Sequence, residues 1–184
     1  EVKEAVELLH DRGPEDLREV TFELSAEMVL LAGRAMSLDE ARAQVRAVVE
    51  DGSAFLKLRE IVRAQGGDPD ALVDLTLLPS AEGTLEVAAP TGGTVQAIDA
   101  EAIGLAAVAL GAGRSRVDDP VDHGVGLMVL KKVGDRVEAG EPLATVHFGK
   151  RGEPAAAVAD RVRRAYQIGE QELPPEPILL GRIG

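Results

Sequence analysis

The chain has 184 residues, of which 45% are hydrophobic, and its formal net charge is −12 at pH 7. A chain of this size and composition forms one ordinary globular domain or two small ones. The acidic balance disfavours nucleic acid and anionic membranes as partners, because both carry negative charge themselves. The aromatic residues are three Phe and one Tyr, so we expect no base-stacking platform and a core of Leu, Val, Ile and Ala.

The sequence also bears on the cellular setting. It contains no cysteine, which excludes disulfides and thiol chemistry and fits a reducing compartment. No apolar run reaches transmembrane length, and no signal-peptide pattern opens the chain, so we expect a cytoplasmic protein with no membrane partner. Residues 1–9 have a helical pattern without an initiator Met or a capping residue before it. We therefore expect the chain to start within a helix, as a trimmed, cleaved or split polypeptide would.

Helical patterns occupy the first 75 residues. Pro14 suits the first position of a helix, in which apolar residues recur at helical spacing. Ser37 and Glu40 have the spacing of a capping box and predict the next helix, which ends at Gly52. A further helix is expected over residues 54–65. The apolar stripes are Leu17, Val20, Leu24, Met28 and Leu31 in the long helix, and Leu38, Ala41, Val45, Val48 and Val49 in the next.

These short helices each carry one apolar stripe, and such helices rarely persist without a surface to pack on. We expect that surface to be a sheet supplied by a part of the protein that precedes residue 1. A helical bundle that closes on itself is the alternative.

From about residue 77 onward, short β-prone runs alternate with Gly and Pro turns. We expect strands over residues 84–89, 93–98, 126–130 and 142–148. A helix over residues 102–110 should end at Gly111, and a last helix should start at Pro154. The segment Thr91-Gly92-Gly93 is expected to be a hairpin turn between the first two strands. The tail around Ile178-Leu179-Leu180 is expected to be an edge strand or disordered.

Several stretches follow one another in a distinctive order across nearly the whole chain. They are Glu1-Val2-Lys3-Glu4-Ala5, Gly13-Pro14-Glu15-Asp16-Leu17, Ala64-Gln65-Gly66-Gly67-Asp68, Ile98-Asp99-Ala100 with Ile103-Gly104, Leu110-Gly111-Ala112-Gly113-Arg114, Val125-Gly126-Leu127, and Lys131-Lys132-Val133-Gly134-Asp135-Arg136-Val137 with Gly140-Glu141-Pro142-Leu143-Ala144. Their order and spacing resemble the C-terminal part of the pyrimidine-nucleoside (thymidine) phosphorylase family.

This resemblance implies a fold and an activity. The fold class would be α+β: residues 1–75 would be the helical end of an α/β domain, and residues 76–184 a β-rich C-terminal domain with a terminal helix and tail. The full-length enzyme would be a homodimeric pentosyltransferase that reversibly cleaves pyrimidine nucleosides with phosphate, giving the base and a pentose 1-phosphate. The family's catalytic and substrate-binding residues lie upstream, so none is assigned here. The chain would be a structural support for cleft closure, inactive alone and dependent on the missing N-terminal part.

One functional residue is carried over by the resemblance. Family members with a structural potassium site use a Glu at the position that corresponds to Glu4, and no other cofactor is implied. A carboxylate together with backbone carbonyls suits this hard cation. The residues alone favour a solvated surface carboxylate at Glu4, and only the motif match favours a metal ligand.

A second resemblance concerns residues 129–143. Their turns at Gly134-Asp135 and Ala139-Gly140, with Val137, Leu143 and Val146 facing inward, are similar to the barrel-sandwich pattern of biotinyl and lipoyl carrier domains. Lys150 falls near the position of the modified Lys, but its surroundings lack the flanking residues that modifying enzymes recognise. Shared architecture without the modification is the favoured interpretation. A stand-alone carrier or binding module, or a nucleoside monophosphate phosphorylase, is the alternative function.

The remaining motifs favour structural roles. His10, His123 and His147 are far apart in sequence and do not have the spacing of a zinc site. We expect His147 to face solvent or a domain contact and His123 to lie in a turn. The segment 111–114 follows a helix and so presents carbonyl groups, which disfavours a phosphate site.

Overall fold

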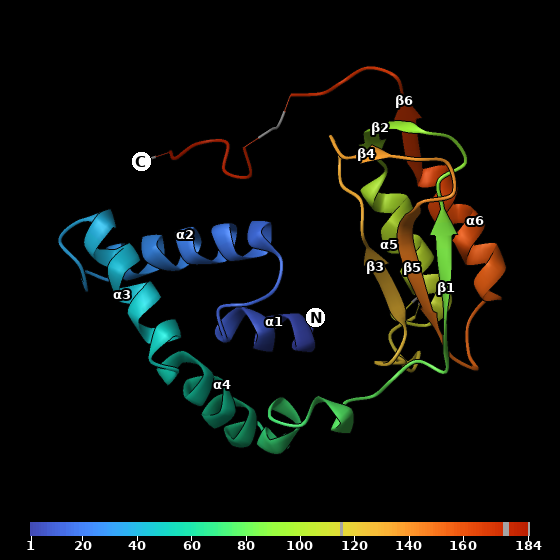
Figure 1. Ribbon diagram of the computed structural model, residues 1–184. Coiled ribbons are helices and arrows are strands. Elements are labelled where there is room, and N and C mark those ends of the chain that lie inside the picture. Colours follow the sequence, from blue (N-terminus) through green and yellow to red (C-terminus); the bar gives the residue numbers. More distant parts are fainter. Residues whose placement is uncertain (115, 175–176, 184) are drawn as a thin grey trace. The chain divides into compact units, whose positions relative to one another are not determined.

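The computed structural model describes residues 1–114, 116–174 and 177–183, which divide into two compact units (Figure 1). The first unit is Glu1–Leu77 together with Pro177–Gly184, and the second is Leu78–Glu176. The change from helical to β-rich structure was predicted at residues 75–76. The sequence prediction placed the last residues with the β-rich domain, whereas their contacts group them with the helices.

The first unit is helical. Its helices are α1 (Val2–Leu9), α2 (Glu15–Leu31), α3 (Leu38–Glu50) and α4 (Ser53–Ala64), followed by the 3₁₀ turns η1 (Pro69–Leu72) and η2 (Leu75–Leu77). Pro14 is the N-cap of α2, one residue before the position predicted for it. Gly52 has φ of 77°, a left-handed conformation that separates α3 from α4 at little cost for a residue without Cβ.

The capping box at the start of α3 is present in a modified form. The Ser37 hydroxyl accepts a hydrogen bond from the Glu40 amide at 3.2 Å, as predicted. The Glu40 carboxylate in turn accepts from the Met36 amide at 2.8 Å, one residue before the N-cap. The first bond satisfies an amide that the helix itself leaves unpaired, and the second holds the residue before the N-cap, so this N-terminus is fixed locally.

The buried cluster between α2 and α3 is small and consists of Ala26, Ala35, Ala41 and Val45. The other buried apolar residues in the described part of the first unit are Val6, Leu8, Val49 and Leu72. Along α2, three residues of the predicted apolar stripe are exposed: Leu24 by 56%, Met28 by 70% and Leu31 by 82%. On α3, Val48 was predicted to be buried and is 42% exposed. That prediction is wrong for this chain because α3 packs on α2 through the side of the helix that carries Ala41 and Val45.

The second unit contains two three-stranded antiparallel sheets and two helices. One sheet has the order β1 (Gly83–Ala88), β5 (Pro142–Phe148), β3 (Gly126–Val129). The other has the order β4 (Arg136–Val137), β2 (Gly93–Ile98), β6 (Tyr166–Gly169). The helices are α5 (Ala100–Leu110) and α6 (Ala155–Ala165). The four predicted strands and both predicted helices are confirmed to within two residues.

The connection from β1 to β2 corrects one prediction. These strands belong to different sheets, so Thr91-Gly92-Gly93 is a crossing between sheets and does not form a hairpin turn. The preceding Pro90 has no amide to donate to a ladder, and the pairing of β1 with β5 is already irregular at Val87 and Ala88. The predicted turns at Gly134 and Gly140 are present, both with positive φ.

A single core unites this second unit. Its fully enclosed members come from both sheets and both helices, and they include Val87, Val95, Leu110, Val137, Leu143, Val146, Val158 and Val162. Helix α6 packs on β1 and β5 as well as on α5. The α+β class is therefore confirmed. The barrel-sandwich arrangement is not confirmed, since strand pairing gives two open sheets.

Candidate functional site

The predicted metal ligand, Glu4, lies in the first turn of α1 and is exposed to solvent. Among the described residues, no group of three or more His, Cys, Asp or Glu is close enough to hold a metal ion. An accessible carboxylate oxygen is suited to a hard cation, but one carboxylate does not complete its coordination shell.

The three histidines lie in separate places. His10 ends α1, where its Nδ1 is 2.8 Å from the Val6 carbonyl oxygen and its ring lies 4.5 Å from that of Phe55. His123 is exposed and lies in a turn, as predicted. His147 is half-buried in β5, opposite both β1 and β3. These contacts of His10 are those of a residue that joins α1 to α4.

Lys150, the position similar to a carrier lysine, follows β5 and is highly exposed. Its Nζ lies 3.1 Å from a carboxylate oxygen of Glu82, and its side chain is 84% exposed. A pair this exposed contributes little to stability and is readily opened by solvent. The geometry therefore leaves Lys150 accessible. The sequence around it still lacks the flanking residues that modifying enzymes recognise.

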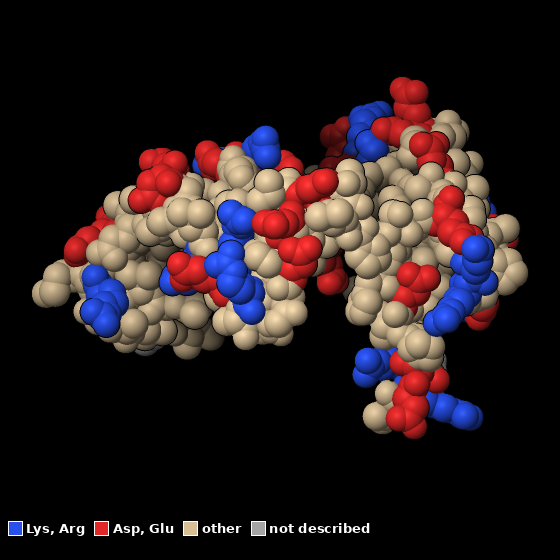
Figure 2. Space-filling model, turned by 90° about the horizontal axis from the view of Figure 1, so that it is seen from below, with Lys and Arg blue, Asp and Glu red and all other residues tan. Residues whose placement is uncertain are grey.

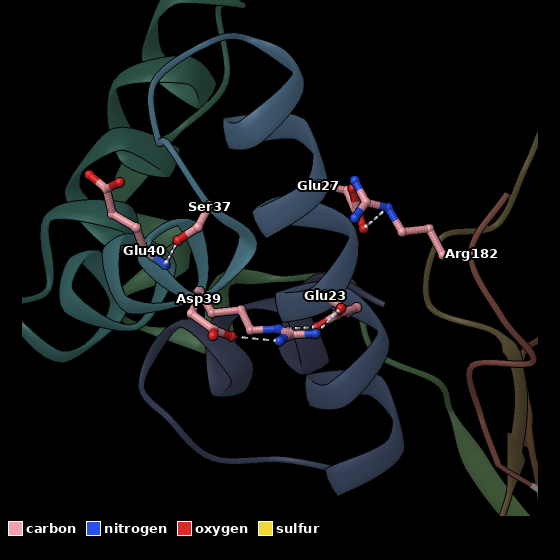
Figure 3. A network of polar contacts seen from close by, with 7 residues as sticks. Glu23, Glu27, Ser37, Asp39, Glu40 and Arg182 are labelled. Carbon is pink, nitrogen blue, oxygen red and sulfur yellow. Dashed lines mark hydrogen bonds and ion pairs between the residues drawn. The ribbon is translucent and has the colours of Figure 1, made fainter. Parts of the chain in front are cut away.

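The most developed polar network joins α2 to α3 (Figure 3). Arg42 donates from Nε to one carboxylate oxygen of Glu23 at 2.8 Å and from Nη2 to the other at 2.5 Å. Its Nη1 donates to Asp39 at 3.0 Å. The hydrogen bond from Arg42 lowers the pKa of Glu23, and the same bond raises that of Arg42. A guanidinium bonded to carboxylates of both helices in this way fixes α2 against α3.

A second carboxylate of α2 faces the chain's last residues. Glu27 lies one turn after Glu23, and its Oε1 is 2.9 Å from Nε of Arg182 (Figure 3). Sequence reasoning missed this network. The spacing of Asp39 and Arg42 could have indicated one of its contacts, but a contact between residues 27 and 182 leaves no local signal.

In the second unit, Tyr166 connects the two sheets through its hydroxyl group. This hydroxyl lies 3.1 Å from the carbonyl oxygen of Leu143 and 3.2 Å from that of Lys131, and it donates to them. Burial, with a smaller contribution from the charge of Asp135, raises the pKa of Tyr166 to about 12. The phenol is therefore held in its neutral, donating form and has a structural role.

One surface depression lies in the second unit. A shallow depression of about 380 Å³ is lined by Arg136, Val137, Glu138 and Glu141. Glu141 is already paired with Lys131 at 2.5 Å. Figure 2 shows basic side chains next to acidic ones on the visible face. No helix in the described part of the chain is both long and apolar enough to cross a membrane.

Comparison with known proteins shows what the chain resembles. Residues 94–169, from β2 to β6, match the family model of the pyrimidine nucleoside phosphorylase C-terminal domain. The chain is also 44% identical over 175 residues to the pyrimidine-nucleoside phosphorylase of Bacillus subtilis (strain 168). Over nearly its whole length the chain is similar to pyrimidine-nucleoside phosphorylases. A thymidine phosphorylase of Burkholderia cenocepacia (strain HI2424) is 43% identical over 165 residues.

These phosphorylase relatives are much longer than the chain. The alignments cover 94% of this chain but 40% of the Bacillus subtilis protein, and 88% of this chain but 37% of the Burkholderia cenocepacia protein. The chain thus spans less than half the length of the relatives that it matches. The predicted resemblance to the C-terminal part of pyrimidine-nucleoside phosphorylases is confirmed.

Proposed function

We propose that this chain is the C-terminal part of an enzyme that reversibly cleaves pyrimidine nucleosides with phosphate. The products would be the free base and ribose or deoxyribose 1-phosphate. The observation that carries this proposal is the identity of 44% to a pyrimidine-nucleoside phosphorylase over 94% of the chain. The substrate and the phosphate would bind in parts of the longer protein that precede this chain.

The first unit supports a role within a larger protein. Its buried cluster between α2 and α3 contains three alanines and one valine, whereas large apolar side chains of α2 and α4 face outward. Examples are Met28, which is 70% exposed, and Leu56, which is 56% exposed. Apolar surface of this kind is stabilised when another part of the protein covers it. We propose that an upstream sheet of the same protein covers these helices, and that protomers associate as a homodimer.

The second unit would be a rigid support. Thirteen buried residues from two sheets and two helices form its core, and a core of this density resists deformation. We propose that the two sheets form a barrel-sandwich-like body without a modified lysine. Such a body would hold the larger lobe of the enzyme in place while the cleft closes over phosphate and nucleoside.

We further propose Glu4 as one ligand of a structural potassium ion. The support is its exposed carboxylate in the first turn of α1, where an anionic side chain also interacts favourably with the helix dipole. A bound cation would fix the start of this helix and would take no chemical part in phosphorolysis. The proposed setting of the enzyme is the cytoplasm, which the absence of cysteine supports.

Phosphorolysis assays test the proposal directly. A longer polypeptide that carries this chain at its C-terminus should release thymine or uracil from the nucleoside only when phosphate is present. The purified chain alone should release no base, because the substrate and the phosphate would bind in the part of the protein that precedes it. Clear turnover by the chain alone, or a long form that accepts nucleoside monophosphates and not nucleosides, would contradict the proposal.

A further inference from the structure

The two helices of the second unit differ in the residues that they present to solvent. Both have eleven residues. Helix α6 carries charged side chains on the side away from its buried residues, among them Asp160, Arg161 and Arg164, as expected of a helix at a protein surface. In α5 the one charged residue is Glu101, and the rest are apolar or glycine. A helix that is apolar on all sides is typical of the interior of a larger protein.

One side of α5 is covered within the second unit, where Ala106 and Leu110 are fully buried and the helix packs on α6 and β3. The opposite side is not covered. Leu105 is 61% exposed there, and Gly104 next to it is also exposed. The outer face of α5 is formed by the residues that share this side at helical spacing, namely Glu101, Gly104, Leu105 and Val108.

Gly104 indicates that this face is approached closely by another segment. A glycine inside a helix is destabilising relative to alanine, because it loses more backbone freedom on folding. A Cβ added at Gly104 would meet no atom of the described chain within 4 Å. Nothing in the described chain therefore requires glycine at this position. A glycine does allow the backbone of a covering segment to come near, which a larger side chain would prevent.

The length of the relatives indicates what covers the outer face of α5. The chain corresponds to 40% of the Bacillus subtilis phosphorylase and matches the family model of a C-terminal domain, so a long part of such a protein precedes the matched region. The second unit already has a core drawn from two sheets and two helices, and the outer face adds nothing to it. A second copy of the chain is disfavoured, because two molecules with a net charge of −12 repel each other.

We propose that the outer face of α5 docks against an apolar surface of the part of the protein that precedes residue 1. Leu105 would be buried in this contact, and Gly104 would be the point of closest approach. The inference rests on the proposed function in one respect, that the chain is the C-terminal part of a longer enzyme. It names the face by which the second unit would be held to that enzyme.

Thiol alkylation of the chain and of a longer polypeptide that includes it tests the docking. The chain contains no cysteine, so Leu105→Cys introduces a single thiol on the outer face of α5. Ala157→Cys, at an exposed position of α6, is the matched control. The reaction with N-ethylmaleimide is followed by mass spectrometry of the peptides that contain these positions. In the long form, Leu105→Cys should react roughly tenfold more slowly than in the chain alone, and Ala157→Cys at an unchanged rate.

Two results of this experiment would overturn the proposal. One is an equal rate for Leu105→Cys in the two forms, which would mean that the preceding part does not cover α5. The other is slow reaction already in the chain alone, which would mean that the face is covered without the preceding part. A rate that falls as the concentration of the chain rises would identify a second copy as the cover.

A substitution at Gly104 tests the close approach separately. In the chain alone, Gly104→Leu should raise the midpoint of urea unfolding, because leucine is the better helix former and meets no neighbour. In the long form, the same substitution combined with Leu105→Cys should return the alkylation rate toward that of the chain alone, since the added side chain keeps the covering segment away. A thiol that stays fully protected in this double variant would contradict the close approach at Gly104.

These readouts require no catalysis, so the docking and the proposed function can fail independently. A long form that protects position 105 but does not cleave nucleosides would contradict the proposed function and support the docking. A long form that cleaves nucleosides with phosphate but leaves position 105 fully reactive would overturn the docking alone.

Discussion

Replacement of Gly152 by Ala tests the packing of the second unit in detail. Gly152 has φ of +86°, and a Cβ added there would lie 2.4 Å from the carbonyl oxygen of Leu110. This contact is with backbone at the end of α5, which cannot move aside as a flexible side chain could. The next residue, Glu153, donates its amide to Ala109 at 2.8 Å, so the segment is also held against α5.

The matched control is Gly140→Ala. Gly140 has φ of +87°, but a Cβ added there would have no neighbour within 4 Å. Both substitutions carry the cost of a left-handed conformation, about 1 kcal/mol after allowance for the stiffer unfolded chain. Only Gly152→Ala adds overpacking, which costs about 1–3 kcal/mol more.

Urea unfolding followed by circular dichroism measures both effects. Gly152→Ala should lower the free energy of unfolding by about 2–4 kcal/mol, and Gly140→Ala by about 1 kcal/mol. The difference between the two variants isolates the clash with α5. Equal destabilisation by the two substitutions would refute the close approach of residue 152 to the end of α5.

Three further predictions concern the core and the titrating groups. Leu143 is fully buried, so Leu143→Ala should lower the free energy of unfolding by about 2–5 kcal/mol. Leu105 is 61% exposed, so Leu105→Ala should change this free energy little. Thermal or urea unfolding distinguishes the two variants. Tyr166 is the chain's one tyrosine, so near-ultraviolet absorbance reports it alone, and it should ionise near pH 12. Because the pKa of Tyr166 is raised in the folded state, the stability that this residue contributes should be lost as the pH rises from the pKa of the unfolded state toward 12. A phenol that titrates near pH 10 would contradict its burial. Glu23 has a lowered pKa, so its contribution is present above its unfolded pKa and is lost as the pH falls through the folded value; Glu23→Gln should therefore flatten the acid limb of the stability profile.

The sequence predicts the regular elements well because their signals are local. Gly111 ends α5 with φ of 99°, and the Ser37 hydroxyl caps α3 as its spacing with Glu40 indicates. The strands over residues 93–98 and 142–148 coincide with the alternation of apolar residues. These features depend on a few neighbouring residues, so no knowledge of the tertiary structure is needed to find them.

Pairing between distant residues was not predictable in the same way. Strand β4 has two residues and β6 four, too few for an alternation to stand out. The partner of β1 is β5, some sixty residues later, and a hairpin with β2 was the simpler local expectation. Sheet order is decided by which apolar faces share a core, and that is a property of the whole unit.

The assignment of Glu4 as a metal ligand stays a prediction. The family resemblance indicated Glu4 and is itself confirmed by the relatives, yet a single carboxylate cannot specify its distant ligands. The contact between Glu27 and Arg182 was missed because it joins residues more than 150 positions apart. Val48 was misplaced because apolar periodicity identifies a stripe without telling which of its edges faces a partner.

The central claim is that the helices of the first unit are shaped to be covered by another part of a pyrimidine-nucleoside phosphorylase. Amide hydrogen exchange measures this most directly, in the chain alone and in a longer polypeptide that includes it. The account predicts that α2 and α4 exchange much more slowly in the long form, while α6, whose buried face is already covered within the second unit, changes little. Equal protection of α2 and α4 in both forms would contradict it.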